Sequence, residues 1–351
     1  MGAPLLIGLV LWLACAGSGD AAQPRDRLER FRELASARLA AVEDTGDALD
    51  AVVQDEIEAL LDAEVLESLG TGGPFASLEF IRDRLEAFGD AWGGASLRLE
   101  PLRGGFLLGR FRLSAKGVAN SIRLYGMTGG GPVLVRSWRE DGVPEIYPWP
   151  ERGAAAAFLV VWAGAQTGWG SWPARLTLWR VRGGSITATW RSAERFRETL
   201  WVARLAVVRE TVFIRYELRY PGWKPGCDVQ SEQEDLYRVD AASGSLKLVS
   251  RRLFNGWHRE LQATVTRFFA AAAAGDGRGI AGLVPDAGLR ATLPGGLSPE
   301  VACDVQSPET PGTVVVAASA PLPDGRRSPW ALWWSRGPSG WRLRGAAPVL
   351  Q

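Results

Sequence analysis

Short runs in which hydrophobic and polar residues alternate constrain this chain more than any other feature. From residue 96 to residue 252 the hydrophobic period is two, and Gly-rich turns separate the runs at intervals of about ten residues. Alternation gives a strand one face toward a core and one face toward solvent. The runs are residues 96–100, 106–113, 121–127, 133–139, 158–163, 174–182, 185–191, 200–208, 211–220 and 245–251. Many short strands joined by turns predict an all-β sandwich or a propeller-type sheet.

Two hairpins of similar sequence repeat within this region. Segments 178–187 and 236–247 each combine an aromatic-Arg-Val strand, a Gly-containing turn and a return strand. Such a unit resembles a propeller blade. Residues 96–252 supply about three blades of roughly 45 residues, whereas a closed propeller needs about four. We therefore favour an open or sandwich-like antiparallel array, and a chance similarity of two hairpins is the alternative.

Helical periodicity precedes and follows the strand region. Hydrophobic residues three and four apart predict helices within residues 25–90, with breaks at 44–47 and 70–74. After residue 255 a long helix is expected first, and the elements after it are a short helix at 279–283 and strands at 300–305, 313–319, 330–335 and 341–346. A helix followed by an antiparallel sheet is an α+β pattern. The predicted fold class is therefore multi-domain α+β.

The C-terminal quarter resembles a known superfamily. Residues 266–284 read TRFFAAAAAGDGRGIAGLV, and residues 330–350 read WALWWSRGPSGWRLRGAAPVL. Both segments look like the nuclear-transport-factor-two-like (cystatin-like) superfamily, in which a long helix leads into a cone-shaped curved sheet. That fold hosts enzymes and non-catalytic binding modules, and the acid and His of its enzymes have no clear counterpart here. The organisation expected is a leader at 1–22, a helical region at 23–92, an antiparallel β domain at 93–252 and a cystatin-like α+β domain at 253–351.

An apolar leader opens the chain. No charged residue precedes Asp20, and residues 5–16 form an almost continuous apolar run. The run is too short for a helix across a hydrocarbon core of ~30 Å, but it has the length of the apolar part of a secretory signal. Small residues follow it, although the usual Lys or Arg near the start is absent. The leader predicts an extracytoplasmic protein.

Cys15 separates two forms of export. Residues 11–15 read LWLAC and resemble the lipobox of bacterial lipoproteins, in which the Cys becomes the lipid-bearing first residue. Trp12 stands where the lipobox favours Leu. The resemblance implies a lipid on Cys15 that anchors the protein to a membrane face without spanning it. Cleavage near Ala16 is the alternative, and it gives a secreted soluble chain.

Composition excludes several classes of site. The chain has 40 Lys and Arg against 39 Asp and Glu, and this balance excludes a basic nucleic-acid groove as the organising feature. The many Arg residues are expected to be evenly spread and balanced by acids. A single His excludes a site with two imidazoles, and three Cys without a C-x-x-C pair exclude a thiolate zinc site. No P-loop, dinucleotide-binding glycine motif or H-E-x-x-H motif is present. We expect no cofactor, no metal and no nucleic-acid partner.

The pentapeptide CDVQS occurs twice, starting at Cys227 and at Cys303. Two thiols in an exported protein often pair, because the compartment is oxidising. The bridge would close a loop of 75 intervening residues, for which chain entropy gives a stabilisation of about 4 kcal/mol. Two buried free thiols are the alternative.

Few residues are candidates for catalysis. His258, the single imidazole, stands at a helix start and no G-x-S-x-G motif supplies a Ser for it, so we expect a structural role. Glu232 and Glu234 would share one strand face, and with Asp235 they could form the carboxylate pair of a cell-wall or carbohydrate hydrolase. A solvated strand entry is the simpler interpretation. We therefore favour a non-catalytic protein and keep the hydrolase as the alternative.

Two loops place aromatic residues among turn residues, where they are hard to bury. These are Trp169 and Trp172 in the segment GWGSWP, and Tyr220 and Trp223 in the segment YPGWKPG. Exposed rings could stack on sugar faces or on proline-rich peptide, and rings folded back onto the sheet are the alternative. The function expected is binding or scaffolding at the cell envelope, with an envelope protein, peptide or glycan as partner.

Overall fold

The computed structural model describes residues 26–349 apart from 46–49, 116, 118, 150–155, 241–242, 308–309 and 311, and it describes residues 39–45 by their backbone alone. The leader and Cys15 lie outside the described residues. The chain divides into two compact units, Met1–Ala95 and Ser96–Gln351. Helices and antiparallel sheets make up the described residues, so the predicted mixture of α and β structure is confirmed. No described helix combines the length and the apolar composition that crossing a membrane requires.

The first unit consists of helices. They are α1 (Arg27–Thr45), α2 (Ala51–Thr71), η1 (Gly73–Ala76) and α3 (Leu78–Ala91). Phe31, Leu61 and Phe88 are fully buried between them, as the hydrophobic stripes predict, and the rings of Phe31 and Phe88 are 5.0 Å apart. Asp50 caps α2 by accepting a hydrogen bond from the Val52 amide at 2.8 Å.

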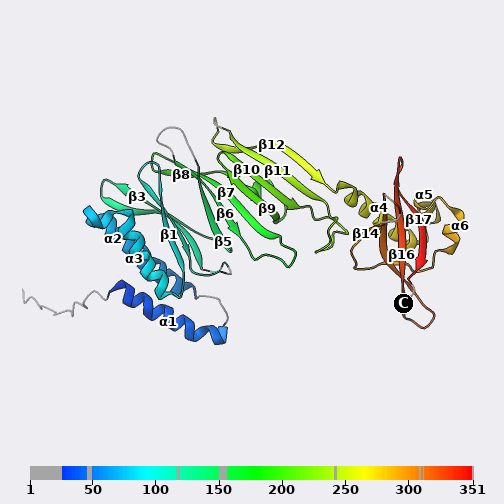
Figure 1. Ribbon diagram of the computed structural model, residues 1–351, viewed down its shortest axis with the longest axis horizontal. Helices are drawn as coiled ribbons and strands as arrows, with labels where there is room; N and C mark the ends of the chain where they lie inside the picture. Colours follow the sequence, from blue (N-terminus) through cyan, green and yellow to red (C-terminus); the bar gives the residue numbers. More distant parts are fainter. Residues whose placement is uncertain are drawn as a thin grey trace, which may run out of the picture. The chain divides into compact units, whose positions relative to one another are not determined.

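The second unit begins with a four-stranded antiparallel meander. Its strands are β1 (Ser96–Leu102), β2 (Phe106–Arg112), β3 (Asn120–Thr128) and β4 (Gly131–Arg139). An eight-stranded sheet follows, in the order β12-β11-β10-β9-β7-β6-β5, with β8 paired to β7 (Figure 1). Its strands are β5 (Val143–Trp149), β6 (Ala156–Ala163), β7 (Trp172–Arg182), β8 (Ser185–Arg191), β9 (Leu200–Val208), β10 (Thr211–Glu217), β11 (Glu232–Asp240) and β12 (Ser245–Phe254), and η2 (Ser192–Glu194) follows β8.

The eight-stranded sheet buries both of its faces over β6 and β7. On one face Phe158 and Val160 pack against Ile122 of the meander. On the other face Leu159 packs in a second core with Ile214 and other residues of β9–β12. The sheet can enclose that core because β7 divides its pairing, with its first residues bonded to β9 and its later ones to β8.

The two similar hairpins of the sequence are β7–β8 and β11–β12. Each contains a register shift, and the shifts fall at Leu178/Trp179 and at Leu236/Tyr237, which are matching positions of the repeat. The hairpins touch where the hydroxyl of Ser245 donates to the Thr189 carbonyl at 2.8 Å. Both belong to one sheet, whereas propeller blades are separate sheets. The shared bulge favours a true structural repeat over a chance similarity.

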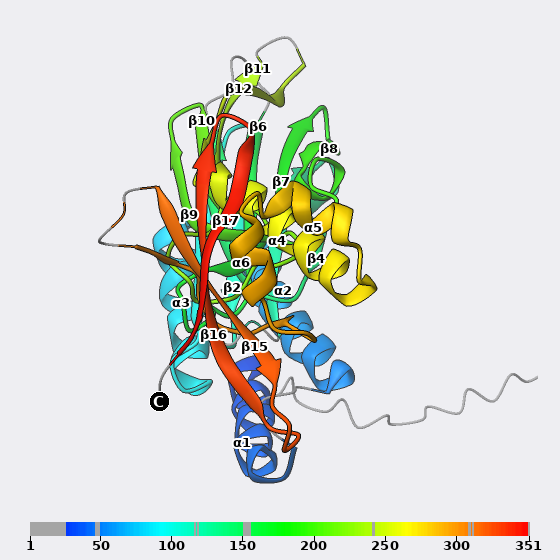
Figure 2. The same cartoon turned by 90° about the vertical axis from the view of Figure 1, so that its right-hand side faces the viewer.

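The end of the chain is a long helix followed by an antiparallel sheet. The helices are α4 (Gly256–Ala274), α5 (Gly277–Leu283) and α6 (Ala287–Thr292), and the strands are β13 (Ser298–Pro299), β14 (Val305–Gln306), β15 (Thr313–Pro321), β16 (Arg327–Gly337) and β17 (Gly340–Pro348). Phe268 of α4 contacts Trp334 of β16 with ring centroids 5.5 Å apart, and α4, α5 and α6 all contact β17 (Figure 2). The continuous strand expected at 300–305 is wrong, because a turn at residues 301–304 separates β13 from β14.

Candidate functional site

The loop between β10 and β11, residues 218–231, carries two of the predicted aromatic residues and one predicted cysteine. Cys227 is joined to Cys303, with their Cα atoms 5.4 Å apart. The predicted pair is therefore at bonding distance in the structure, and it links this loop to the turn before β14. The continuous strand expected at 300–305 does not form, because Cys303 and Asp304 in this turn are bonded to residues 218–231.

Asp304, the second residue of the second CDVQS copy, is buried with 5% of its surface exposed. Its Oδ2 accepts hydrogen bonds from His258 Nε2 at 2.9 Å and from Gln262 Nε2, and its Oδ1 accepts from Lys224 Nζ at 3.2 Å. Nδ1 of the same ring is hydrogen-bonded to the Tyr220 hydroxyl, so the imidazole links the carboxylate to the loop. This network satisfies the buried carboxylate and fastens the loop to α4.

His258 and Tyr220 therefore have structural partners. His258 stands at the start of α4, as expected, but it is 1% exposed and does not reach the surface. Tyr220 is half-buried, its oxygen also accepts the Ser231 amide at 3.2 Å, and burial raises the pKa of its phenol. We infer that Tyr220 holds the loop in place and offers only its ring to a ligand.

The two aromatic loops, predicted from separate segments, meet in the structure. Trp169 lies in the β6–β7 loop, is 55% exposed and places its ring against the backbone of Gly226. A Cβ at Gly226 would come within 2.9 Å of that ring, and the residue has φ of +80°. Glycine is therefore favoured here both by the close contact and by the backbone conformation. The Thr167 amide donates to the Ser171 carbonyl at 2.7 Å and fixes the shape of the Trp169 loop.

An arginine sandwiched between two tryptophans completes this surface. The guanidinium carbon of Arg219 lies 3.8 Å from the ring centroid of Trp201 and 4.6 Å from that of Trp223. Arg219 Nη2 also donates to Glu217 at 3.0 Å. We call Trp169, Trp201, Arg219, Tyr220 and Trp223 the aromatic cluster.

Trp172 does not belong to the aromatic cluster, whereas Trp201, which the sequence analysis did not single out, does. Trp172 is the first residue of β7, and it packs against the core enclosed by the eight-stranded sheet. Trp201 lies on a strand whose alternation reads as ordinary core packing, yet its ring faces Arg219 on the outer side. Only the strand register could have revealed this, and the sequence carries no signal for it.

A cavity of about 540 Å³ lies at the base of the β6–β7 loop that carries Trp169, between β6, β7 and the segment after η2. Trp162, Phe196 and Leu200 give it apolar walls. Arg175 lines it too, but its charge pairs with Glu140 at 3.1 Å, and burial raises the pKa of that carboxyl group. The cavity was not expected from the sequence, because distant segments supply its walls.

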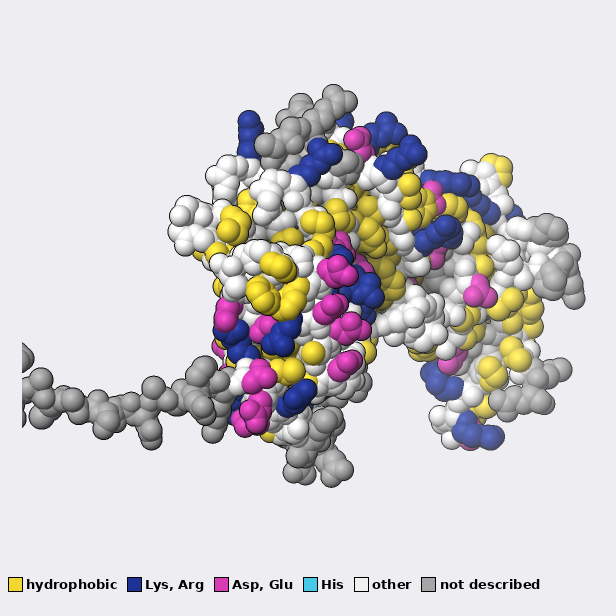
Figure 3. All heavy atoms as spheres, turned by 60° about the vertical axis from the view of Figure 1, so that its left-hand side comes forward, with side chains coloured by type: hydrophobic (Ala, Val, Ile, Leu, Met, Phe, Trp, Pro, Cys, Tyr) yellow, Lys and Arg dark blue, Asp and Glu magenta, His cyan; other side chains and the backbone are white. Residues whose placement is uncertain are grey.

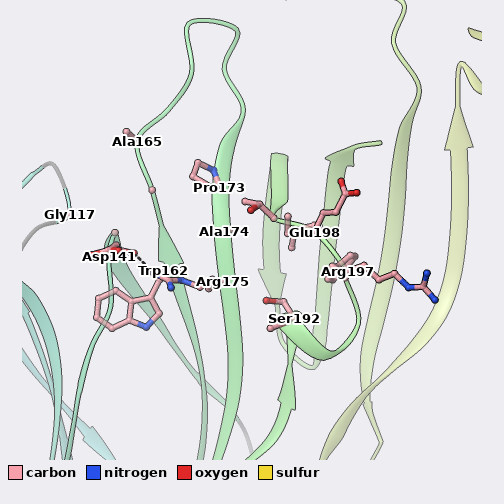
Figure 4. A pocket seen from close by; sticks show the side chains of 16 residues that line it. Gly117, Asp141, Trp162, Ala165, Pro173, Ala174, Arg175, Ser192, Arg197 and Glu198 are labelled. Carbon is pink, nitrogen blue, oxygen red and sulfur yellow. Dashed lines mark hydrogen bonds between the residues drawn. The ribbon is translucent and has the colours of Figure 1, made fainter. Parts of the chain in front are cut away.

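Figure 4 shows how the charged residues of this cavity are placed. Ala165 and Pro173 flank the base of the loop that carries Trp169, and Arg197 extends away from Trp162 (Figure 4). Among the described lining residues, no two carboxylates converge on the centre of the cavity. The cavity therefore has the character of an apolar recess with a polar rim.

The carboxylates of the hydrolase alternative lie on β11. Glu232 and Glu234 share its outer face, as alternation predicts, and Glu232 pairs with Arg215. Asp235 points the other way, is fully buried, and accepts two hydrogen bonds from Arg251, each 2.8 Å long. In the described part of the chain, no three His, Cys, Asp or Glu residues are placed to hold a metal ion.

Two buried phenols complete the shell around Asp235. The hydroxyls of Tyr216 and Tyr237 each donate to its Oδ2 at 3.2 Å. Burial, followed by the charge of Asp235, raises the pKa of Tyr237 to about 12 and raises that of Tyr216 as well. Asp235 is therefore saturated with donors, an arrangement that suits a structural anion.

Comparison with known proteins gives no family for this chain: no protein-family model matches it, and no curated protein shows a significant match.

Proposed function

We propose that this protein is a non-catalytic binding module that works outside the cytoplasm and holds its ligand against the aromatic cluster. The observation that carries the proposal is Arg219 between the rings of Trp201 and Trp223, in a loop whose Gly226 lies against the exposed ring of Trp169. Flat rings stack on sugar faces, and a guanidinium adds hydrogen-bond donors at their edge. The bridge and the Asp304 network hold the loop before binding, which lowers the entropy cost of association.

The proposed location rests on the leader and the cysteine pair. A disulfide persists in an oxidising compartment, and the apolar run of the leader suits export. Lipid on Cys15 would keep the protein on a membrane face, and cleavage would release it. Mass analysis of the native N-terminus distinguishes the two forms, and an intact Met1 would contradict export.

The C-terminal domain serves as a support in this proposal. We propose that residues 253–351 belong to the cystatin-like superfamily, on the strength of a long helix packed on an antiparallel sheet. Residues 93–252 are proposed as a sandwich-like β domain that presents the ligand surface. In this proposal the C-terminal domain holds the β10–β11 loop in place through Asp304 and Cys303, which bond to Lys224 and Cys227 of that loop.

Binding to immobilised polysaccharides tests the proposal. The intact protein is measured against a panel of neutral and acidic polysaccharides, together with W169A and W223A. Loss of a stacked ring typically costs about 1–3 kcal/mol, so each variant should bind about 5- to 150-fold more weakly. W333A, which removes a half-buried Trp from β16, is the matched control. Equal binding by W169A, W223A and wild type would contradict the proposal.

A further inference from the structure

The two units of the chain carry opposite charge. Up to Ala95 the sequence has 18 Asp and Glu against 7 Arg, and from Ser96 onward it has 21 Asp and Glu against 33 Lys and Arg. The even spread expected from the whole-chain balance is therefore wrong. Asp and Glu side chains gather over the helices, whereas Lys and Arg side chains with hydrophobic ones between them are frequent over the strands (Figure 3).

Several of these cations share the outer side of β9–β12, the side that faces away from the enclosed core. Strand alternation and register place six residues there, which we call the arginine face: Arg204, Arg215, Arg238, Lys247, Arg252 and Phe254. Arg204, Arg238, Lys247 and Arg252 are exposed, and the side chain of Arg215 is 38% exposed. The cations lie on neighbouring strands and are open to solvent.

Like charges lie directly opposite each other at two places on this face. Arg204 of β9 is the cross-strand partner of Arg215 of β10, and Arg238 of β11 is the partner of Lys247 of β12. Opposed like charges destabilise a sheet. An anion bound on this face would offset the repulsion within both pairs.

Aromatic rings lie against several of these guanidinium groups. Arg215 lies 4.4 Å and Arg252 lies 4.5 Å from the ring centroid of Phe254, and Arg204 lies 5.7 Å from that of Phe213. The arginine face continues to Arg219 of the aromatic cluster, which stacks in the same manner. Rings and guanidinium groups thus alternate across the strands.

Acidic residues on the same side reduce its positive charge without removing it. Glu232 pairs with Arg215, and Glu217 pairs with Arg219. Glu234 stands between Arg215 and Arg252 in the register. For Arg238 and Lys247 no carboxylate lies within ion-pair distance among the described residues.

We propose that the arginine face binds an anionic polysaccharide, which continues onto the aromatic cluster. This inference rests on the proposed function and names its ligand class. Neighbouring strands lie about 4.8 Å apart, so the line from β9 to β12 spans about 14 Å, and a row of cations of that length suits a polymer better than a small molecule. Guanidinium groups pair with carboxylate or sulfate groups, and the rings pack on the apolar faces of sugars.

Single-stranded nucleic acid also stacks on rings and pairs with arginine. The disulfide and the leader favour the polysaccharide, because they place the protein where extracellular glycans occur. The experiment must therefore separate these two polymers.

Binding of the intact, disulfide-bonded protein is measured against alginate, neutral dextran and oligo-dT at low salt and at about 0.5 M NaCl. The double variant R204A/R252A should bind alginate at least tenfold more weakly at low salt. The control R326A/R336A removes two exposed arginines of the C-terminal domain and should stay within twofold of wild type. Thermal unfolding of each variant establishes that it folds.

The outcomes distinguish the arginine face from the aromatic cluster. Unchanged alginate binding in a folded R204A/R252A, or tighter binding of oligo-dT than of alginate, would overturn the inference. Equal affinity for dextran and alginate would also overturn it, while leaving the proposed function in place. If W169A loses binding but R204A/R252A does not, the aromatic cluster stands alone. If no polysaccharide binds, both proposals fail.

Discussion

The inner and outer faces of β9–β12 handle charge in opposite ways. Inside, Asp235 is surrounded by Arg251, Tyr216 and Tyr237, and each of its oxygens accepts hydrogen bonds. Outside, Arg204 faces Arg215, and Arg238 faces Lys247. The same strands thus satisfy one charge completely and leave others opposed. The inner face satisfies its charge within the protein, whereas the outer face is only partly neutralised, by Glu232 and Glu234, and the proposed anionic ligand would balance the rest.

The bridge between Cys227 and Cys303 should have the largest effect on stability. C227S/C303S should lower the free energy of unfolding by about 4 kcal/mol, because the unfolded chain regains the freedom of a long loop. Urea denaturation measures this, and dithiothreitol on the wild type is the matched treatment. The loop beneath the aromatic cluster loosens, so polysaccharide binding should fall too. A loss of unfolding free energy under about 1 kcal/mol would contradict this account of the bridge.

Asp235 tests the inner face. D235N should lower the free energy of unfolding by about 2–4 kcal/mol, because Arg251 and two phenols lose their shared acceptor charge. E234Q changes the next residue on the outer face and should cost less than about 0.5 kcal/mol. Comparable losses in both variants would remove the contrast between the faces.

Alkaline pH weakens the same inner network. The pKa of Tyr237 is raised from 10 to about 12, so the folded state holds its proton more tightly than the unfolded state does. Its stabilising contribution is complete below pH 10 and is lost as the pH rises through about 12. Chemical denaturation at several pH values, with absorbance at 295 nm, should show falling stability in this window. Y237F should fall less, and ionisation of Tyr237 near pH 10 would contradict the account.

Arg204 tests the outer face and should have the smallest effect. R204A removes the repulsion with Arg215, so the free energy of unfolding should rise by about 0.5 kcal/mol at low salt. The gain should shrink at high salt because screening weakens the repulsion in the wild type. R326A, which breaks the exposed pair with Asp324, should not gain stability. A clear loss in R204A would mean that this arginine stabilises the fold.

Much of the strand pattern was predictable because alternation reports a local fact, the burial of every second residue. β5 was missed since Pro144 and Pro148 interrupt its pattern, and an edge strand tolerates them because one of its sides needs no sheet hydrogen bonds. The turn after β13 was missed because Asp304 and Cys303 are drawn toward a loop far away in sequence. Contacts between residues far apart in the sequence do not produce a periodic hydrophobic pattern, so the sequence does not reveal them.

The candidate site shows the same division. Repetition of CDVQS pointed to the cysteine pair, and turn composition pointed to Trp169 and Trp223. Arg219 and Trp201 stayed hidden because their contact depends on strand register, which one sequence does not reveal. The charge contrast between the units was readable, but only after the boundary at Ala95 was known.

Hydroxyl-radical footprinting of the intact protein, with and without saturating alginate, tests the central claim most directly. The account predicts that oxidation of Trp169, Trp223 and Phe254 falls when alginate is bound, while Trp333 is unaffected. Unchanged oxidation at those three residues, with protection of Phe196 in the cavity instead, would place the ligand elsewhere and contradict the account.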